Sequence, residues 1–448
     1  MSIQRRCNSI LNVWIVACAI VLCGFLLATT ATAASTPIYG PTVITQPGTY
    51  YLANSIVNST EPVAILIQCS NVVLDGKAKT IDGTDQAGSV GIKIYNAAMT
   101  LVNVVVKNVI CMDWESGVVL SDVKNSVFEK ITAKSNTYYG VLVGGSSGNT
   151  FDKLTLADNG YDGILLYGSS NLNTISNSLS QNNGWSGVRV KASNGNIIQK
   201  SKFLNNLNHG IYLHDGANYN TITQNTITGN LIDGIKLYQD CNFNTITKNT
   251  ITKQFNGAGL YSFKSDYNTI SANTIQDCHN GIYIHTESDN NAISGNTIQN
   301  CTIDGIVLRN DANYNVISGN TVKKNLATGL ALDGSDKNII YSNIIRENQV
   351  QGAWIAGSSQ NNVIFNNYFY NANNTKFATA SENTWNLTYG NVKSITGGKY
   401  SGGNSWGQPN GQGFSQVTPD SDGDGICDSP YSMATNNIDK LPLKYKKK

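Results

Sequence analysis

We predict an all-β fold, a single-stranded parallel β-helix of about twelve coils, from two repeated phrases in the sequence. One phrase is a glycine followed by aliphatic residues, and the other is Asn-Thr-Ile or a close variant, which recurs with the same period. A fixed period of 22 to 26 residues is typical of repeat architectures. The first phrase is a glycine followed by alternating aliphatic residues, and it occurs twelve times at intervals of 22 to 26 residues, at Gly91, Gly117, Gly140, Gly163, Gly187, Gly210, Gly234, Gly259, Gly281, Gly305, Gly329 and Gly352.

The residue types within each period favour strands over helices. Ile, Val and Thr dominate and alternate with polar residues, and no run of helix formers is amphipathic. A leucine-rich-repeat horseshoe has a similar period, but leucine is sparse here. The half of each repeat that would be helical in that fold reads Thr-Ile-Thr in this sequence, which favours a strand. Each period is therefore expected to hold about three short strands joined by tight turns, which coil into a β-helix.

The corners of the coil are expected at recurrent asparagines. In "NTITQNTITGN", residues 220–230, Ile222 and Ile227 can both point inward only if the strand alternation resets near Gln224 and Asn225. Successive corner asparagines should stack as a ladder that satisfies backbone groups freed by the turns. These residues are Asn225, Asn249, Asn273, Asn296, Asn320 and Asn343.

The first residues are expected to form a signal peptide, residues 1–33. Arg5 and Arg6 precede an apolar run over residues 10–28, and small residues at Ala31 and Ala33 suit a signal peptidase. We expect export, with an extracellular or cell-surface location and the periplasm as a possible alternative. An uncleaved segment would instead be a membrane anchor, and no other stretch is long and apolar enough to span a membrane.

The remaining chain is expected to comprise an N-terminal cap with the first coils (residues 34–90), the β-helix repeats (91–375) and a C-terminal block with a basic tail (376–448). With the signal removed, 29 basic residues balance 29 acidic ones. This neutrality argues against a nucleic-acid partner, which requires a basic surface. We expect a monomer.

The sequence as a whole resembles the NosD-like, carbohydrate-binding and sugar-hydrolase family of right-handed parallel β-helices. The resemblance rests on "ITQPGTYYLANSI" at Ile44 and "NVVLDGKAKTIDG" at Asn71, and on a C-terminal series of "NTWN", "GGNSWG", "DSDGDGICDSPY" and "NIDKLPL". It implies a right-handed helix and a secreted or surface location. Members include polysaccharide lyases, epimerases, surface proteins and periplasmic accessory factors, so the resemblance does not fix an activity.

One outward face of the repeats is rich in tyrosines and charged residues. The second and fourth residues after each anchor glycine should face out, and the residue before the glycine should line the same surface. Exposed aromatic rings can stack on sugars, so we expect this face to bind an extended polysaccharide or cell-envelope glycan without catalysis. The expected binding residues are Tyr167, Arg189, Tyr212, Tyr238, Tyr261, Tyr283, His285 and Arg309.

Two other function classes stay open. A lyase, epimerase or glycoside hydrolase would need a base, an acid and a charge neutraliser, and the catalytic candidates are His214, Asp215, Asp233 and Lys236. A structural or adhesive rod of the cell envelope would need no sugar site. A copper-accessory role is disfavoured, because the four histidines and four methionines form no clustered tract.

Residues 420–431 read "DSDGDGICDSPY", which predicts a structural calcium ion. Asp420, Asp422, Asp424 and Asp428 take positions 1, 3, 5 and 9 of an EF-hand-like loop with Gly425 at position 6. The glutamate expected at position 12 is replaced by Tyr431.

Six cysteines lie outside the signal, without the paired spacing of a zinc site. Cys278 and Cys301 should lie on adjacent coils, where either a disulfide or two stacked free thiols is possible.

Overall fold

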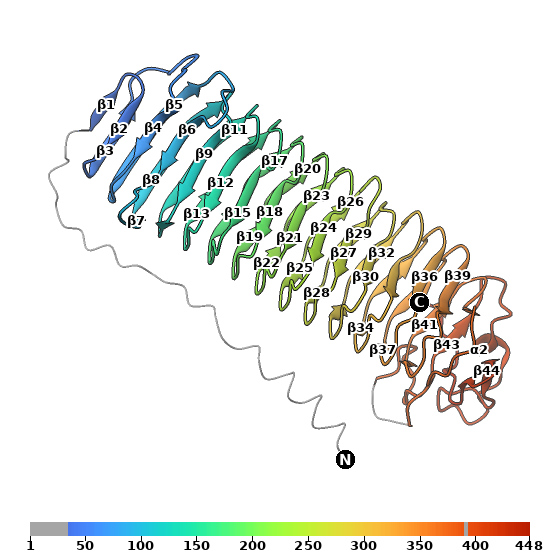
Figure 1. Cartoon of the computed structure of the whole chain (residues 1–448). Coiled ribbons are helices and arrows are strands. Elements are labelled where there is room, and N and C mark those ends of the chain that lie inside the picture. Colours follow the sequence, from blue (N-terminus) through green and yellow to red (C-terminus); the bar gives the residue numbers. More distant parts are fainter. Residues whose placement is uncertain (1–34, 389–392) are drawn as a thin grey trace. The chain divides into compact units, whose positions relative to one another are not determined.

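The computed structural model describes residues 35–388 and 393–448, and it is the predicted parallel β-helix (Figure 1). Successive turns of the chain lie side by side and pair in parallel through two large sheets. The expected signal peptide, residues 1–33, lies outside the described residues. Within the described part of the chain, no helix has the length and hydrophobicity needed to cross a membrane.

The first of the two sheets, called sheet 1 below, contributes one strand to each turn. Its 15 strands are β2 (Thr42–Ile44), β4 (Val63–Ile67), β6 (Val90–Ile94), β9 (Ser116–Ser121), β12 (Tyr139–Gly144), β15 (Ile164–Tyr167), β18 (Val188–Lys191), β21 (Ile211–His214), β24 (Ile235–Tyr238), β27 (Leu260–Phe263), β30 (Ile282–His285), β33 (Ile306–Arg309), β36 (Thr328–Asp333), β39 (Gln351–Ala356) and β42 (Thr375–Phe377).

The second, called sheet 2, has 26 strands and contributes two short strands to most turns. It begins with β1 (Thr36–Ile38), β3 (Gly48–Leu52), β5 (Val72–Asp82), β8 (Val104–Met112) and β11 (Val127–Lys134). The paired strands follow as β13 (Thr150–Asp152), β14 (Thr155–Ala157), β16 (Thr174–Ser176), β17 (Leu179–Gln181), β19 (Ile197–Gln199), β20 (Lys202–Leu204), β22 (Thr221–Thr223), β23 (Thr226–Thr228), β25 (Thr245–Thr247), β26 (Thr250–Thr252), β28 (Thr269–Ser271), β29 (Thr274–Gln276), β31 (Ala292–Ser294), β32 (Thr297–Gln299), β34 (Val316–Ser318), β35 (Thr321–Lys323), β37 (Ile339–Tyr341), β38 (Ile344–Arg346), β40 (Val363–Phe365) and β41 (Tyr368–Tyr370), and β43 (Ser405–Gly407) completes the sheet.

The remaining elements are small. They are a parallel pair, β7 (Leu101–Val102) with β10 (Val123–Lys124), an antiparallel pair, β44 (Tyr431–Ala434) with β45 (Asn437–Asp439), and the short helix α2 (Phe414–Val417).

The β-helix has about fourteen turns rather than the expected twelve. Fourteen steps join the 15 strands of sheet 1. The extra strands are β2 and β4, which precede Gly91, and β42, which follows Gly352. They lack the glycine phrase on which the sequence count relied, because a strand needs only inward aliphatic side chains to join the stack.

The corners lie where the sequence places them. Strand β22 ends at Thr223 and β23 begins at Thr226, with Gln224 in the left-handed region at φ 57°. Each corner asparagine from Asn225 to Asn320 donates through Nδ2 to the Oδ1 of the next, at 3.0 Å in every step. The predicted asparagine ladder is therefore confirmed.

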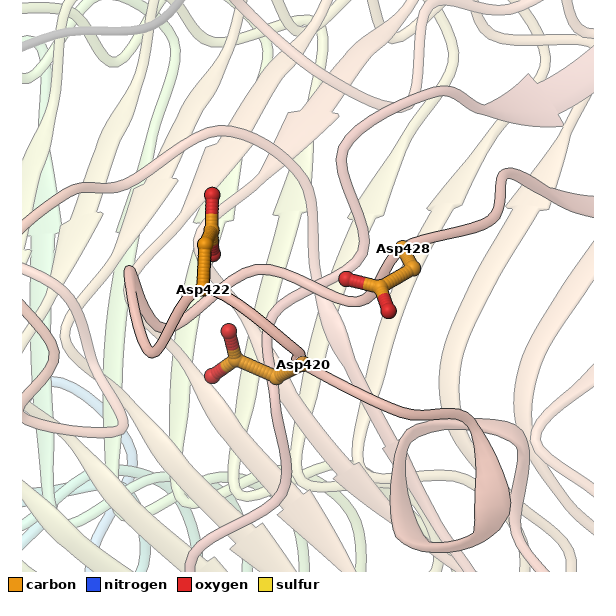
Figure 2. Close-up of side chains that lie close together, drawn as sticks. All are labelled: Asp420, Asp422 and Asp428. Carbon is orange, nitrogen blue, oxygen red and sulfur yellow. The ribbon is translucent and has the colours of Figure 1, made fainter.

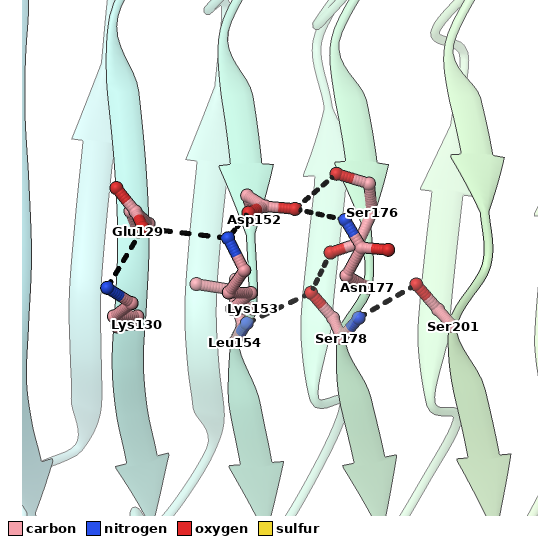
Figure 3. Close-up of polar contacts among 9 residues, drawn as sticks. All are labelled: Glu129, Lys130, Asp152, Lys153, Leu154, Ser176, Asn177, Ser178 and Ser201. Atoms are coloured by element: carbon pink, nitrogen blue, oxygen red, sulfur yellow. Dashed lines mark hydrogen bonds and ion pairs between the residues drawn. The ribbon is translucent and has the colours of Figure 1, made fainter.

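Serines replace asparagine at the same corner in earlier turns (Figure 3). Ser178 Oγ accepts the Leu154 N–H at 3.0 Å, and Ser178 N–H donates to Ser201 Oγ at 3.1 Å. Ser201 N–H then donates to Asn225 Oδ1 at 3.0 Å, which joins the serine rungs to the ladder. A hydroxyl satisfies the backbone donor but lacks the amide's second donor, so these rungs hold fewer bonds.

The anchor glycines are required by close approach rather than by backbone conformation. A Cβ at Gly210 would lie 2.5 Å from Ile227 Cγ2 and 2.7 Å from the Gly234 carbonyl oxygen. Inward side chains such as Ile222 and Ile227 have no exposed surface and fill the interior continuously from turn to turn. A side chain at the glycine would push the turns apart.

The structure resolves the alternative left open for Cys278 and Cys301 in favour of free thiols. They lie on adjacent turns, since Thr302 N–H donates to the Cys278 carbonyl at 2.9 Å, and both side chains are buried. Burial raises the pKa of both thiols, that of Cys278 to about 12.

The C-terminal residues close the open end of the hydrophobic interior. Trp406 on β43 stacks on Phe369 with a centroid distance of 4.7 Å, and Trp385 packs beside it at 5.7 Å. Both indoles are fully buried. The aromatic pair covers the last apolar layer that no further turn can cover.

Candidate functional site

The two outward columns expected on the repeats exist as aligned positions of sheet 1. The strand register places Leu165, Arg189, Tyr212, Lys236, Tyr261, Tyr283 and Val307 in one column. The second column holds Lys191, His214, Tyr238, Phe263, His285 and Arg309. Tyr167 lies at the corresponding end of β15. We call these two columns the tyrosine face.

Lys236 is the centre of the tyrosine face. Its ammonium lies 5.5, 5.2 and 5.4 Å from the ring centroids of Tyr212, Tyr238 and Tyr261. Within the described residues it forms no ion pair, and its nearest recorded partners are the three aromatic rings. Burial is the main cause that raises the pKa of both Tyr212 and Tyr261 to about 12, so their hydroxyls remain donors.

Rings in the second column stack on one another along the β-helix. Tyr238 lies 4.9 Å from Phe263, and Phe263 lies 5.8 Å from His285, with nearly parallel planes. At the end of this row, Arg309 forms an ion pair with Asp333 at 3.1 Å. The face thus presents ring edges and cationic groups side by side.

Most residues before the anchor glycines do not line this surface, contrary to expectation. Asp162, Ser186, His209, Asp233 and Ala258 are buried, whereas Asn280 and Asp304 are partly exposed. Asp233, a catalytic candidate, is only 5% exposed, accepts the Ala258 N–H at 2.8 Å and lies 3.3 Å from His209 Nδ1. Burial raises the pKa of Asp233 to about 6 and lowers the pKa of His209 to about 3.

His214 and Asp215, two further catalytic candidates, form a pair at the end of β21. His214 Nδ1 lies 3.2 Å from Asp215 Oδ2, and the imidazole stacks on Tyr212 at 4.6 Å. His214 is 9% exposed, and its Nε2 is buried without a hydrogen-bond partner. Burial also lowers the pKa of His214, so the neutral imidazole is favoured. The structure brings His214, Asp215 and Lys236 onto adjacent strands but leaves Asp233 beneath the surface.

Arg189 is held by a buried ion pair rather than free for a ligand. Its guanidinium lies 2.6 Å from Asp162 Oδ2, and the Asp162 side chain has no exposed surface. Burial raises the pKa of Asp162 to about 6, against the opposing effect of Arg189.

An aromatic cluster beside the face was missed by the sequence reasoning. Tyr138, Tyr161 and Trp185 stand two residues before Gly140, Gly163 and Gly187, outside the columns counted forward from the glycines. Tyr161 lies 5.0 Å from Tyr138 and stacks on Trp185 at 6.2 Å, and all three rings are partly exposed. The recurrence of an aromatic at this offset is the signal that could have found them.

Three of the four loop aspartates converge far along the chain from the tyrosine face (Figure 2). One carboxylate oxygen from each of Asp420, Asp422 and Asp428 lies within 4.8 Å of the others. Asp424 is not in this group, and its Oδ1 accepts the Ile426 N–H at 2.8 Å. Asp420 Oδ1 is buried without a hydrogen-bond partner. Hydrogen bonds from Ser421 lower the pKa of Asp428.

The fold and the repeats define the chain as a right-handed β-helix protein. A family model described as "Right handed beta helix region" matches residues 116–275. A second model, described as "Periplasmic copper-binding protein (NosD)", matches residues 36–178 and 254–411, more than half of the chain. The protein therefore belongs to the NosD family. No curated protein shows significant similarity to it.

Solved β-helix structures resemble the chain at low sequence identity. A periplasmic alginate epimerase, AlgG, is 14% identical with a TM-score of 0.42, covering 73% of this chain and 78% of its own. The AlgE4 A-module of Azotobacter vinelandii mannuronan C-5 epimerase is 13% identical with a TM-score of 0.44, covering 75% and 90%. The Agl-KA catalytic domain is 14% identical with a TM-score of 0.41, covering 78% and 62%. These similarities are too distant to transfer an activity.

The side chains present do not fit the copper ion in the family's description. Copper in proteins prefers clustered thiolate, thioether or imidazole ligands. Three of the four histidines are engaged, His209 with Asp233, His214 with Asp215 and His285 with Thr286 at 2.7 Å. The fourth, His279, is exposed and belongs to no cluster of potential ligands in the described part of the chain. Over residues 35–388 and 393–448, the grouping of three or more potential ligands is the aspartate loop, which offers hard oxygens.

Proposed function

We propose that the tyrosine face binds an extended polysaccharide and that the protein is exported and non-catalytic. The observation that carries the proposal is the unpaired Lys236 ammonium enclosed by Tyr212, Tyr238 and Tyr261. Aromatic side chains bring apolar surface with hydroxyl donors at one edge, and a cation among them can contact carboxylates or hydroxyls of a polymer. Because the columns continue over successive turns, the contacts repeat along one direction, which suits a linear chain.

The burial of Asp233 and His214, two of the four catalytic candidates, supports binding without catalysis. A general acid or base must come within hydrogen-bond reach of the substrate. Asp233 is buried, and Arg189, which could neutralise a substrate carboxylate, is already paired with Asp162. A lyase, epimerase or hydrolase on this face would have to work through His214, Asp215 and Lys236 alone.

Affinity electrophoresis against a panel of acidic and neutral polysaccharides tests the proposal. Wild-type protein should be retarded by at least one acidic polymer, and Lys236→Met or the pair Tyr238→Ala and Tyr261→Ala should abolish the retardation. Tyr341→Ala, a matched tyrosine on sheet 2, should leave it unchanged. Wild-type migration unaffected by every polymer would contradict the proposal and favour a structural or adhesive role.

Product formation separates binding from catalysis. Incubation with the same polymers should release no unsaturated uronate and no new reducing ends. Product formation that is lost in His214→Ala would replace the binding proposal with the enzymatic one.

We also propose that the aspartate loop holds a structural calcium ion. The orphaned Asp420 Oδ1 supports it, because a buried carboxylate oxygen without a donor is stabilised by a cation, and Asp422 and Asp428 supply further hard ligands. The loop is tied to the end of the chain by the Lys444 N–H, which donates to the Gly425 carbonyl at 2.9 Å. The ion would therefore fasten the C-terminal segment.

Thermal unfolding with calcium or chelator tests the ion. Calcium should raise the melting temperature of the wild type and protect the C-terminus from proteases, because a ligand bound by the folded state alone stabilises it. Asp422→Asn with Asp428→Asn should remove both effects, while the exposed Asp311→Asn should keep them. Isothermal titration calorimetry that detects no calcium binding to the wild type would contradict the proposal of a structural calcium ion.

A further inference from the structure

A row of exposed aromatic rings runs along the turns that lead from sheet 1 to sheet 2. Tyr219, Phe243 and Tyr267 occupy the same position in three successive turns. Their rings are stacked at centroid distances of 5.1 and 5.0 Å, with interplanar angles of 5° and 7°. The three residues are 61%, 45% and 52% exposed. We call them the aromatic ridge, and none of them belongs to the tyrosine face.

The ridge residues adopt a backbone conformation that disfavours large side chains. Their φ angles are 59°, 58° and 57°, in the left-handed region. The flanking turns place Gly195 and Asn290 at this position, residue types that tolerate such angles. The left-handed backbone disfavours a large side chain at these positions, and the exposed rings contribute little to the packing of the interior. Neither the local conformation nor the core therefore explains the aromatic residues. Such a combination indicates a surface used for contact.

Stacking decides what the ridge can contact. Each inner ring face is covered by a neighbouring ring, so the ridge presents ring edges and the hydroxyls of Tyr219 and Tyr267. A pyranose ring packs on a free aromatic face, which the interior of the ridge does not offer. A slender apolar chain can instead lie along the ring edges.

The surroundings of the ridge are acidic in a chain that is nearly neutral overall. Residues 214–220, 238–244, 263–268 and 285–291 hold five carboxylates and one lysine, whereas the whole chain has 31 basic and 29 acidic residues. The lysine, Lys264, pairs with Glu287 at 3.2 Å, and Lys191 pairs with Asp215 at 3.5 Å.

The other three carboxylates, Asp240, Asp266 and Asp289, form no ion pair in the described part of the chain. Burial, and then neighbouring carboxylates, raise the pKa of Asp266 and Asp289. The ridge therefore borders a negative charge that the chain itself does not neutralise.

A later turn shows which side chain complements this position. Tyr314 occupies the ridge position two turns after Tyr267, and Lys337 takes the same position one turn later. The Lys337 ammonium lies 5.1 Å from the Tyr314 ring centroid and donates to the tyrosine hydroxyl at 3.0 Å. A lysine can thus hold its ammonium by a ring at this position and donate to the tyrosine hydroxyl, and the methylene stem of a longer-reaching lysine can lie along apolar surface while its head stays in water.

We propose that the aromatic ridge is a docking surface for a basic, extended polypeptide segment of a partner protein. The methylene stems of its lysine or arginine side chains pack along the ring edges of Tyr219, Phe243 and Tyr267. Their cationic heads reach the carboxylates of Asp240, Asp266 and Asp289. This surface is independent of the polysaccharide proposal, since it shares no residue with the tyrosine face.

Fluorescence anisotropy with a labelled peptide of alternating lysine and glycine tests the docking, using the full exported chain at low ionic strength. The ridge variant combines Tyr219→Asn, Phe243→Asn and Tyr267→Asn, because Asn290 shows that asparagine suits this turn. We expect it to fold with an unchanged melting temperature and to weaken peptide binding about tenfold or more. Asp266→Asn with Asp289→Asn should weaken binding similarly. Tyr238→Ala with Tyr261→Ala should bind like the wild type.

Four results would overturn the docking proposal. The wild type fails to bind the peptide, or the carboxylate variant loses binding while the ridge variant retains it, which would mean unspecific charge attraction. Analytical ultracentrifugation shows wild-type self-association that the ridge variant loses, which would make a second copy the occupant. The ridge variant loses polysaccharide retardation, which would assign the ridge to the glycan.

Discussion

Asp439 shows how one buried side chain can fix the end of a solenoid. Its carboxylate has no exposed surface and accepts N–H donors from the backbone of Asn404 at 2.7 Å, the Trp406 indole at 2.8 Å and the backbone of Leu441 at 3.2 Å. Burial outweighs these bonds and raises the pKa of Asp439 to about 7. The residue joins β43 to the last residues of the chain, so its protonation state is linked to the stability of this end.

Replacing Asp439 by asparagine should destabilise the protein by about 3 kcal/mol, because an amide nitrogen would face buried N–H donors. A pKa raised on folding means that the folded state binds the proton more tightly, so wild-type stability falls as pH rises from about 4 to about 7. The asparagine variant lacks this titration. The difference in melting temperature between the two proteins, followed by tryptophan fluorescence, should therefore be larger at pH 5 than at pH 8.

Other titrating groups contribute equally to both proteins and cancel in that comparison. An equal difference at the two pH values would show that Asp439 does not titrate on folding.

At the scale of elements, the asparagine ladder is what holds the corners of successive turns together. Asn273 receives the backbone N–H and Nδ2 of Asn249 on its Oδ1, at 2.9 and 3.0 Å. Its own Nδ2 donates to the Ile246 carbonyl at 2.9 Å and to Asn296 Oδ1 at 3.0 Å. All of these groups are buried, so every rung satisfies polar groups of the turns on both sides.

Asn273→Ala should lower the free energy of unfolding by about 3 kcal/mol, because it leaves several buried donors and acceptors without partners. Asn273→Ser should cost less, since Ser178 and Ser201 show that a hydroxyl can serve at this corner. Urea denaturation followed by circular dichroism measures both. The exposed neighbour Thr274→Ala is the control and should change stability little; equal effects at the two positions would rule out a special role for the ladder.

At the scale of the whole molecule, a stack of identical turns must end in something that is not a turn. Each turn buries its aliphatic residues against the next, and the last one has no successor. Phe369 is covered instead by Trp406, which lies parallel to it with an interplanar angle of 5°. The C-terminal segment therefore acts as the lid of the hydrophobic interior.

Trp406→Ala should cost about 3 to 5 kcal/mol by the usual effect of removing a large buried side chain. The loss should be local, with limited proteolysis first cutting within residues 376–448 while the repeats stay intact, because each turn depends mainly on its neighbours. Trp185→Ala removes a partly exposed indole and should leave the proteolysis pattern unchanged. Simultaneous loss of all turns in Trp406→Ala would contradict local capping.

Much of this architecture could be predicted because the repeat carries the same information many times. The spacing of Ile222 and Ile227 located a corner to within one residue, and the strand register confirmed that the residues of each expected column are aligned. The count of twelve coils was too low, because the turns before Gly91 and after Gly352 fill the interior without the glycine phrase. The aromatic cluster at Trp185 was not predicted, because its residues lie two positions before each glycine and the expected columns reached back only one.

The sequence by itself determined the class of fold, the corners and which residues of successive turns are aligned, since these follow from period and alternation. Only the tertiary structure decided which polar side chains reach the surface. Asp233 and His209 were expected on the same surface as Lys236, yet they are buried while Lys236 is partly exposed. The stacking of Tyr219, Phe243 and Tyr267 likewise arises only when turns 24 residues apart in sequence come to lie side by side.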